Sequence, residues 1–362
     1  MIFAATPESP PGSAPGRYVR ACLRTLTEQE LNRALLARQL LLQRGSLSIP
    51  RALERMGGLQ AQYAPSMYIG LWSRLEGFDR DAHTGGLVRR SVVQATMMRA
   101  TIHLVSKRDY WPLTVAIRGP RRRWWERMHP DRPRDMVAAA KRLRRFLADG
   151  PRKRAEIEEF LGRERALGIG AFLDLVRVPP SGTWEQRRAD IYAAAEDWVG
   201  PEDVELPEGR NVIICRYLAA FGPATKADLA DWAGIDVGEL NDPLEKLKLR
   251  RFENEQGKEL LDLPRAPLPH ADTPAPPRFL PVWDATLLVH ARRTGILPEE
   301  YRPLVFNVKT PNSVNTFLVD GRVAGTWRRE GDRVKLEPFE GVPRKERRAL
   351  DDEAKRLAVF HG

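Results

Sequence analysis

The sequence predicts a mainly α-helical protein with β wings: three tandem winged helix-turn-helix units and a small C-terminal β-domain. Three observations support this prediction, namely an ordinary globular composition, an internal repeat and a proline-rich linker near the end. The chain has 362 residues, of which 42% are hydrophobic and 30% charged. That length suits two or three domains, and that composition can bury a large core.

The repeat spans two copies that lie 72 positions apart. Residues 150–162 read GPRKRAEIEEFLG, and residues 222–234 read GPATKADLADWAG. Gly-Pro breaks a preceding helix, Thr225 with Asp228 resembles a helix-start box, and the final glycine suits a helix end. Each copy therefore predicts a short helix at the same place in a repeated unit.

The elements around the second copy follow a recognisable order. Apolar spacing predicts one helix before it, over residues 213–221, and another after it, over residues 240–247. Residues 251–263 read as two strands joined by a turn. Helix, helix, helix and hairpin is the order of a winged helix-turn-helix.

The first copy lies in a similar context. It follows a predicted helix over residues 136–147 and leads to predicted strands at 176–178 and 183–184. These strands would form a second wing.

A third, more divergent unit opens the fold. A capping box at Thr27 begins a helix that should end at Gly45, and further helices are predicted over residues 48–57 and 65–72. Residues 92–105 then read as a β-hairpin.

The linker has seven prolines in 18 residues, which makes it stiff. The predicted organisation is therefore a disordered lead-in at 1–24, unit 1 at 25–117, a basic segment with unit 2 at 118–208, unit 3 at 209–263, the linker at 264–281, and a β-rich domain with a terminal helix at 282–362.

The positive charge is concentrated in one stretch. The whole chain has a net charge of +11, and residues 118–154 hold 14 Arg and Lys residues against four acids, a net charge of +10. A basic surface beside aromatic residues predicts a polyanionic partner, whereas a merely solvated helix face is the alternative. The predicted phosphate contacts are Arg121, Arg122, Arg123, Arg152, Lys153 and Arg154, with Trp184 and Lys226 as further candidates. Trp184 suits the core equally well.

Several classes of protein are disfavoured. Two cysteines, Cys22 and Cys215, cannot form a disulfide framework or a four-thiolate zinc site. The longest strongly apolar run, residues 212–221, is too short to cross a membrane. Phosphate loops, dinucleotide fingerprints, zinc helices and carboxylate clusters are all missing from the sequence, so neither a metal nor a cofactor is predicted. A cytoplasmic protein is expected.

One segment of unit 1 stands out, the glycine- and proline-bounded stretch GLQAQYAP at residues 58–65. In an extended backbone Gln60 and Gln62 would point to the same side. From the residues alone, two glutamines in a turn are more often solvated polar groups than catalytic ones.

Several motifs, in order, resemble the AlkZ/YcaQ family of winged-helix DNA glycosylases. They are GLQAQYAP, YIGLWSRLEGF, RATIHLVSKRDYW, FLPVWDATLLVHARR and VDGRVAGTWR, and the similarity covers about residues 25–340. The resemblance implies three winged helices wrapped around DNA and a C-terminal β-domain. It also implies a Gln-Φ-Gln catalytic motif, here Gln60 and Gln62, in place of the Gln-Φ-Asp form of the other branch.

This resemblance predicts a monofunctional glycosylase that releases N7-alkylguanine. Such a base is cationic and leaves readily, so neutral amides need only hold a water and stabilise the developing sugar cation. The motif favours bulky adducts or interstrand crosslinks made by DNA-alkylating natural products, in repair or self-resistance. A flipped-out bulky base would not fit a closed pocket, so attack from the minor groove is expected.

Supporting roles are predicted for five other residues. Arg99, Thr101 and His103 alternate along the predicted hairpin and would enter a groove beside the lesion, although His103 could equally be a hydrogen-bonded strand residue. Trp283 and Asp284 lie in a family-like stretch and would support the active site from the β-domain.

Two other functions remain open at this stage. One is a non-catalytic winged-helix transcription regulator, and the other is a glycosylase for small N7-methyl lesions. The expected partner in all cases is double-stranded DNA, alkylated at guanine for the enzyme. The protein is expected to act as a monomer, associated with the nucleoid and without membrane contact.

Overall fold

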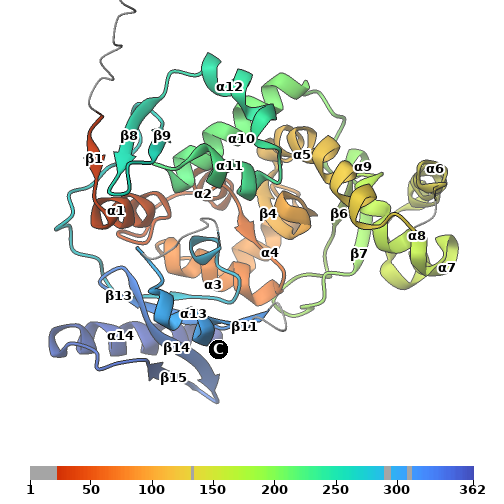
Figure 1. Ribbon diagram of the computed structural model, residues 1–362. Coiled ribbons are helices and arrows are strands. Elements are labelled where there is room, and N and C mark those ends of the chain that lie inside the picture. Colours follow the sequence, from red (N-terminus) through yellow and green to blue (C-terminus); the bar gives the residue numbers. More distant parts are fainter. Residues whose placement is uncertain (1–22, 132–133, 289–294, 308–311) are drawn as a thin grey trace, which may run out of the picture.

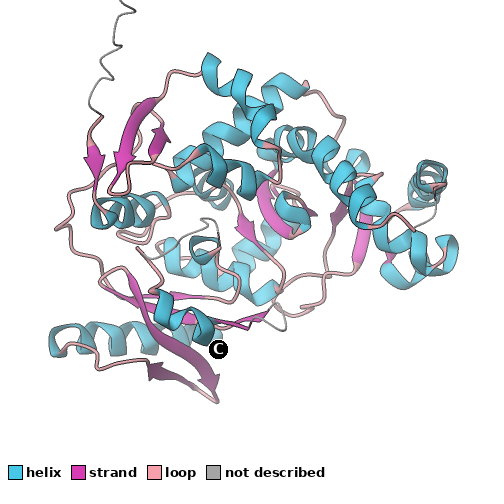
Figure 2. Cartoon of the chain, in the orientation of Figure 1, coloured by secondary structure: helices cyan, strands magenta, loops and turns pink. Residues whose placement is uncertain are grey.

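The computed structural model describes residues 23–131, 134–288, 295–307 and 312–362, which form a mixed α/β fold (Figures 1 and 2). Helices α6, α7 and α8 lie together at one end, and α14 lies with β14 and β15 at the other (Figure 1). The predicted lead-in, apart from its last two residues, is outside the described residues.

The first predicted unit has more elements than its sequence indicates. They are β1 (Thr25–Leu26), α1 (Glu28–Arg38), α2 (Ile49–Met56), β2 (Leu59–Gln60), α3 (Ala64–Arg74), α4 (Arg80–Val88), β3 (Val92–Thr96), the 3-10 turn η1 (Met98–Ala100), β4 (Ile102–Ser106) and α5 (Lys107–Met128). The capping box of Thr27 and Glu30 is confirmed. The prediction that this helix reaches Gly45 is wrong, because α1 ends at Arg38 and Leu40 has a positive φ of 58°.

Tertiary contacts explain why α1 stops early. The buried side chain of Gln39 donates to Met56 O and Ala220 O, at 3.2 and 3.0 Å. The buried Arg38 guanidinium binds both carboxylate oxygens of Asp262 in the third unit. These partners come from distant parts of the chain, so local helix signals could not show them.

The second predicted unit follows the winged-helix order. Its elements are α6 (Met136–Phe146), η2 (Leu147–Asp149), β5 (Arg152–Lys153), α7 (Arg154–Leu161), α8 (Arg163–Gly168), η3 (Ile169–Ala171), β6 (Leu175–Arg177), β7 (Ile191–Ala194) and α9 (Ala195–Val199). The predicted strand at 183–184 is wrong. The partner of β6 is β7, and residues 183–184 belong to the loop between them, where the Ser181 hydroxyl accepts hydrogen bonds from Asp190 N and Ile191 N.

One sheet joins the first two predicted units. Its strand order is β2-β4-β3-β6-β7-β5, so the hairpin β3–β4 and the wing β6–β7 are continuous. The predicted boundary between residues 117 and 118 also falls inside α5. The hairpin therefore has a rigid foundation in the wing of the next unit.

The third predicted unit contains the second copy of the repeat. Its elements are α10 (Leu206–Phe221), α11 (Lys226–Ala233), η4 (Val237–Leu240), α12 (Asn241–Lys246), β8 (Arg250–Asn254) and β9 (Glu259–Asp262). The box of Thr225 with Asp228 is confirmed, and Gly234 ends α11 in the left-handed conformation. The helix–helix–helix–hairpin order holds here too, while the count of three winged helices stays a prediction.

The C-terminal part is rich in strands. It comprises β10 (Arg278–Leu280), η5 (Ala285–Leu287), η6 (Glu299–Tyr301), α13 (Arg302–Val305), β11 (Phe306–Asn307), β12 (Asn312–Ser313), β13 (Thr316–Val319), β14 (Arg322–Glu330), β15 (Arg333–Pro338) and α14 (Arg344–His361). The predicted linker ends too late, because residues 278–280 form the fully buried strand β10 beside β13.

The core lies around the crossing of α5 and α10. Ile213, Ile214 and Phe221 of α10 are buried in the same apolar cluster as Leu113 and Ile117 of α5. The two helices approach closely at Gly209, where a Cβ atom would lie 2.7 Å from Pro112 O. This packing fixes α5, and with it the hairpin that precedes it.

Candidate active site

Two glycines bring the glutamine motif onto the hairpin. Gly57 and Gly58 have φ values of 73° and 83°, which favour glycine, and they turn the chain sharply after α2. A Cβ atom on Gly58 would lie 3.0 Å from Leu104 O. The turn lets β2 pair with β4, so that Gln60 lies opposite His103.

Both glutamines are oriented by donors from the hairpin. The Oε1 atom of Gln62 accepts a hydrogen bond from Ile102 N at 2.6 Å, and Gln60 Oε1 accepts from Arg99 Nη2 at 3.4 Å. Gln60 is buried with 6% of its surface exposed, whereas Gln62 is exposed. Because a carbonyl oxygen has two lone pairs, each Oε1 can still accept a second hydrogen bond, for example from a water.

The hairpin turn differs from its prediction. Arg99 and Ala100 have φ values of 52° and 55°, so Arg99 lies in the turn η1 and does not alternate with His103 along a strand. Its guanidinium also approaches Trp232 O of α11 at 3.4 Å. Burial lowers the pKa of Arg99, and Asp231 opposes that shift. Arg99 therefore joins the hairpin turn, Gln60 and α11.

The side chains of Thr101 and His103 contact backbone atoms of the hairpin itself. Thr101 donates to Met98 O at 3.0 Å and thereby closes the turn. His103 is 3% exposed, and its Nδ1 lies 3.1 Å from Thr101 O. Burial, and secondarily Arg99, lowers the pKa of His103 to about 3, so the ring is neutral at physiological pH. His103 thus lies in β4 as a buried residue whose ring nitrogen is within hydrogen-bond distance of the backbone. Contact of Arg99, Thr101 and His103 with a DNA groove stays a prediction.

A cavity of about 600 Å³ lies beside the turn, between α5 and α11. Arg99, Arg127 and the exposed Trp124 are among its lining residues, together with Asp231. The surface next to the glutamine motif is thus hollowed and carries both basic and aromatic groups.

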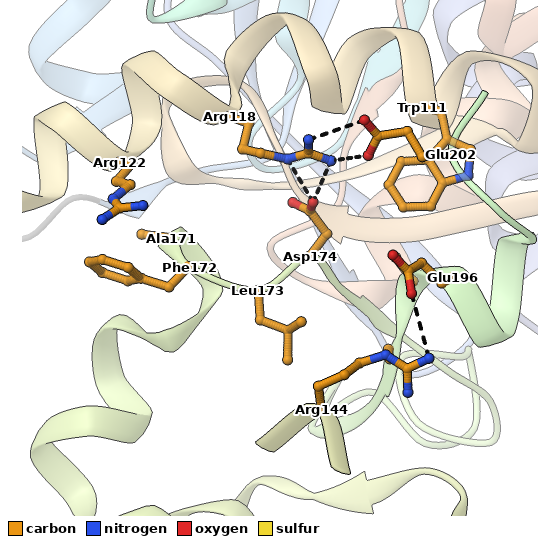
Figure 3. Close-up of a pocket in the computed structure, with 12 residues that line it drawn as sticks. Trp111, Arg118, Arg122, Arg144, Ala171, Phe172, Leu173, Asp174, Glu196 and Glu202 are labelled. Atoms are coloured by element: carbon orange, nitrogen blue, oxygen red, sulfur yellow. Dashed lines mark hydrogen bonds and ion pairs between the residues drawn. The ribbon is translucent and has the colours of Figure 1, made fainter. Parts of the chain in front are cut away.

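The predicted phosphate contact Arg121 has another role. Its side chain is 9% exposed, and it donates to Thr96 O at 2.7 Å and to Asp174 at 2.8 Å. Arg118 binds the same carboxylate and also Glu202, around a cavity of about 290 Å³ (Figure 3). Arg121 therefore fastens the hairpin base to the wing.

The other arginines of the first run are more exposed. Arg122 pairs with Glu126 at 3.0 Å, and its guanidinium lies 4.7 Å from the ring centroid of Phe172. Arg123 contacts Glu239, which Arg210 also contacts. Each keeps about half of its side chain in solvent.

The second basic run lies on β5 and the start of α7. Arg152 stacks 4.9 Å from the ring centroid of Phe146 and is 4.0 Å from Asp149. Lys153 is exposed, and Arg154 pairs with Glu158 at 2.7 Å. The contact of these three side chains with phosphate stays a prediction.

Trp184 and Lys226 lie elsewhere. Trp184 is 8% exposed and packs against Tyr68 and Phe360, which fits its alternative interpretation as a core residue. Lys226 begins α11 and donates to Asn241 Oδ1 at 2.6 Å.

Asp284 connects the β-domain to the helix after the glutamine motif. Its two carboxylate oxygens bind both terminal nitrogens of Arg74 in α3, at 2.8 and 2.9 Å, and both side chains are almost fully buried. Trp283 has a positive φ of 63°, and its N–H donates to Ser313 Oγ at 2.7 Å. The ion pair of Arg74 with Asp284 therefore anchors the C-terminal end of α3, the helix that follows Gln62.

Two residues that make contacts at the base of the hairpin and the neighbouring strand were not predicted from the sequence. Asp174 binds Arg118 and Arg121, and Arg177 lies on β6 beside the hairpin base. Asp174 has no local signal, but a lone arginine between Val176 and Val178 in an apolar strand could have drawn attention.

The described residues contain no cluster of three or more side chains suited to a metal ion. In the same part of the chain, no helix is long and apolar enough to span a membrane. The fold and site thus define a basic, mixed α/β protein in which a pair of neutral amides is held beside a β-hairpin.

Comparison with known proteins gives this class a name. The family described as DNA glycosylase AlkZ-like matches residues 53–360, which is most of the chain, so the chain belongs to the AlkZ-like DNA glycosylases. The solved structure of the DNA glycosylase AlkZ from Streptomyces sahachiroi is similar, with a TM-score of 0.79 and 20% sequence identity, over 93% of this chain and 97% of that one. No curated protein matches the chain.

The family settles the broad function. The chain is a DNA glycosylase that acts in DNA repair, and its substrate is DNA. The alternative of a non-catalytic transcription regulator is not favoured.

Proposed function

We propose that this DNA glycosylase hydrolyses the N-glycosidic bond of N7-alkylguanine in duplex DNA, with Gln60 and Gln62 as the catalytic residues. The observation that carries this proposal is the position of the two amides. Both Oε1 atoms are held by donors of the same hairpin, Arg99 Nη2 and Ile102 N, within a motif that starts at a tight glycine turn.

The chemistry suits neutral amides. Alkylation at N7 makes guanine cationic, so the base departs without a general acid. The second lone pairs of the glutamine oxygens can accept hydrogen bonds from a water, and their dipoles stabilise the positive charge that develops on the sugar. Neither glutamine is a strong base, which restricts the enzyme to labile leaving groups.

The positions of the two side chains suggest different tasks. Gln62 is exposed and reaches solvent, so it is suited to hold the attacking water. Gln60 is buried against Arg99 and is suited to present a fixed dipole to the sugar. The neighbouring His103 stays neutral and does not serve as the acid.

The preferred substrates are bulky adducts or interstrand crosslinks formed by DNA-alkylating natural products. Crosslinks would be unhooked by hydrolysis of one N7 linkage after the other, in repair or self-resistance. We further propose a monofunctional, metal-independent reaction without strand cleavage, carried out by a monomer associated with the nucleoid in the cytoplasm.

The test is to incubate the protein with duplexes that carry either a crosslink through guanine N7 or a single N7-methylguanine. We expect release of the free modified base and an alkali-labile abasic site from the crosslinked duplex, without strand breaks before alkali. Faster release from the methylated duplex would favour a role in removing small lesions. Release from neither duplex would refute the proposed substrate class.

A further inference from the structure

A row of opposed residues crosses the sheet beside the hairpin. Arg177 on β6 lies opposite Gln94 on β3 and opposite Tyr192 on β7, and Tyr192 lies opposite Arg152 on β5. Directly opposed residues project from the same face of a sheet. Two arginines and a tyrosine therefore share one face of the wing, next to the hairpin that bears Arg99.

Arg177 is a half-buried cation without a carboxylate partner among the described residues. Its Nη1 donates to Thr96 Oγ1 at 3.0 Å, and its guanidinium carbon lies 5.0 Å from the ring centroid of Tyr192. Its Nε is buried and has no hydrogen-bond partner. Burial lowers the pKa of Arg177, Tyr192 opposes that shift, and the nearby positive charge of Arg154 adds to it.

The neighbouring charges leave an excess of positive charge. Arg154 is paired with Glu158. Among the described residues, the carboxylate within 4.0 Å of Arg152 is that of the highly exposed Asp149, and the Arg152 Nε atom is also buried without a partner. Asp190 lies near the wing, but its carboxylate pairs with Arg188. A partly desolvated guanidinium without a counter-charge is costly, and that cost disappears when an anion binds.

We propose that Arg177, flanked by Arg152 and Arg154, binds a backbone phosphate of the DNA strand on the wing face beside the hairpin. This inference rests on the DNA glycosylase function and adds a phosphate site that is separate from Gln60 and Gln62. It assigns Arg152 and Arg154 to one site together with a residue outside the basic segment.

The site is connected to the hairpin through Thr96. Arg177 binds the Thr96 side chain, and Arg121 binds the Thr96 carbonyl, three residues before Arg99. A DNA phosphate bound to Arg177 would therefore hold the DNA strand at the base of the hairpin. The turn of the same hairpin contacts Gln60. Its role is to position DNA, since Arg177 does not touch the glutamines.

The experiment is a neutral-linkage scan with the full chain. Single methylphosphonate linkages are placed at each position of an otherwise undamaged duplex, and Kd is measured for the wild type and for Arg177→Gln. We expect one linkage to weaken wild-type binding about tenfold, as for loss of one charge-assisted contact. The same linkage should weaken Arg177→Gln less than about twofold, because the contact is already missing.

Arg90→Gln is the matched control, since Arg90 also stacks on an aromatic ring, 4.1 Å from the centroid of Trp198. It should keep the wild-type linkage profile. If Arg177→Gln does not fold, as judged by thermal unfolding, Arg177→Lys is scanned, and a reduced penalty at the same linkage is expected. An unchanged profile in the folded Arg177 variant overturns the inference.

The outcome is separable from that of the proposed function. If the scan shows no linkage specific to Arg177 while N7-alkylguanine is still released, only the phosphate site is wrong. If the linkage is found but no modified base is released, the phosphate site stands and the proposed substrate is wrong.

Discussion

The two halves of the basic segment use their positive charges differently. In α5, the guanidinium groups of Arg118, Arg121 and Arg123 contact carboxylates that come from later parts of the chain. In the half from residue 141 to 154, Arg144 and Arg154 pair with Asp197 and Glu158. The other charges of this half include Lys141, Arg145 and Lys153, which are exposed and have no ion pair within the described residues. Arg142 and Arg152 of this half stack on the rings of Phe160 and Phe146.

Stacking and ion pairing leave a guanidinium in different states. An ion pair with a carboxylate uses the donor edge of the group, whereas an aromatic ring covers its face and leaves that edge open to a phosphate. The α5 half therefore holds the hairpin, wing and third unit together. The later half, whose Arg152 and Arg142 lie over the mutually stacked rings of Phe146 and Phe160, is the better phosphate surface.

The largest effect is expected from Asp174→Ala in the paired half. This change leaves Arg118 and the nearly buried Arg121 without their shared counter-charge. The free energy of unfolding should fall by about 2–4 kcal/mol, allowing for the partial exposure of Arg118. Denaturant unfolding measures this. A loss below about 0.5 kcal/mol would show that the paired half is not structural.

The next largest effect is expected from neutralising the open half with Lys141→Gln, Arg145→Gln and Lys153→Gln together. If each contacts a phosphate, the slope of log K against log salt should fall by up to about 0.9 per residue. Stability should change little, because all three side chains are exposed. Duplex binding at several salt concentrations gives both the slope and the affinity.

A second variant with three substitutions controls for the loss of net positive charge. Lys345, Arg348 and Lys355 of α14 are also exposed, with 83%, 94% and 76% of their side chains accessible. Changing them to glutamine should alter the slope much less. Equal slopes for the two triples would mean that the location of the charges does not matter.

A smaller effect is expected from Arg123→Gln. Arg123 shares Glu239 with Arg210, so its removal leaves that carboxylate paired. We expect duplex affinity to change less than about threefold, and stability by less than about 0.5 kcal/mol. A tenfold higher Kd would place Arg123 among the phosphate contacts. The two halves of the basic segment would then not differ in this way.

The rate of base release is expected to be independent of pH between about pH 5 and 8. Glutamine does not titrate, and burial holds the pKa of His103 at about 3, well below its ordinary value of 6.5. His103 therefore stays neutral throughout this range, and its charge changes only as the pH falls toward 3. Single-turnover rates at constant salt test this, and a bell-shaped profile would point to a titrating catalyst that the glutamine site lacks.

The sequence predicts those features that depend on neighbours in the chain. The capping boxes at Thr27 and Thr225 and the helix end at Gly234 are predicted correctly, because a few adjacent residues determine them. The end of α1 is not, because it depends on contacts of Gln39 with Met56 and Ala220.

The candidate active site likewise has features that a local motif predicts and features that depend on distant residues. The glutamine pair could be selected through a family motif, and its place beside the hairpin follows from strand pairing. The role of Arg121 could not be predicted, because Asp174 lies more than 50 positions away. Arg177 was missed because its importance comes from the residues that oppose it on two other strands, Gln94 on β3 and Tyr192 on β7.

The most direct test of the central claim is the single-turnover release of N7-alkylguanine from a crosslinked duplex by wild type, Gln60→Ala and Gln62→Ala. Kd for the same duplex is measured in parallel, so that binding and chemistry are separated. We predict that each substitution slows release by about 100-fold or more, as expected for loss of a preorganised dipole, while Kd changes little. Release at the wild-type rate by both variants would contradict the assignment of Gln60 and Gln62 as the catalytic residues.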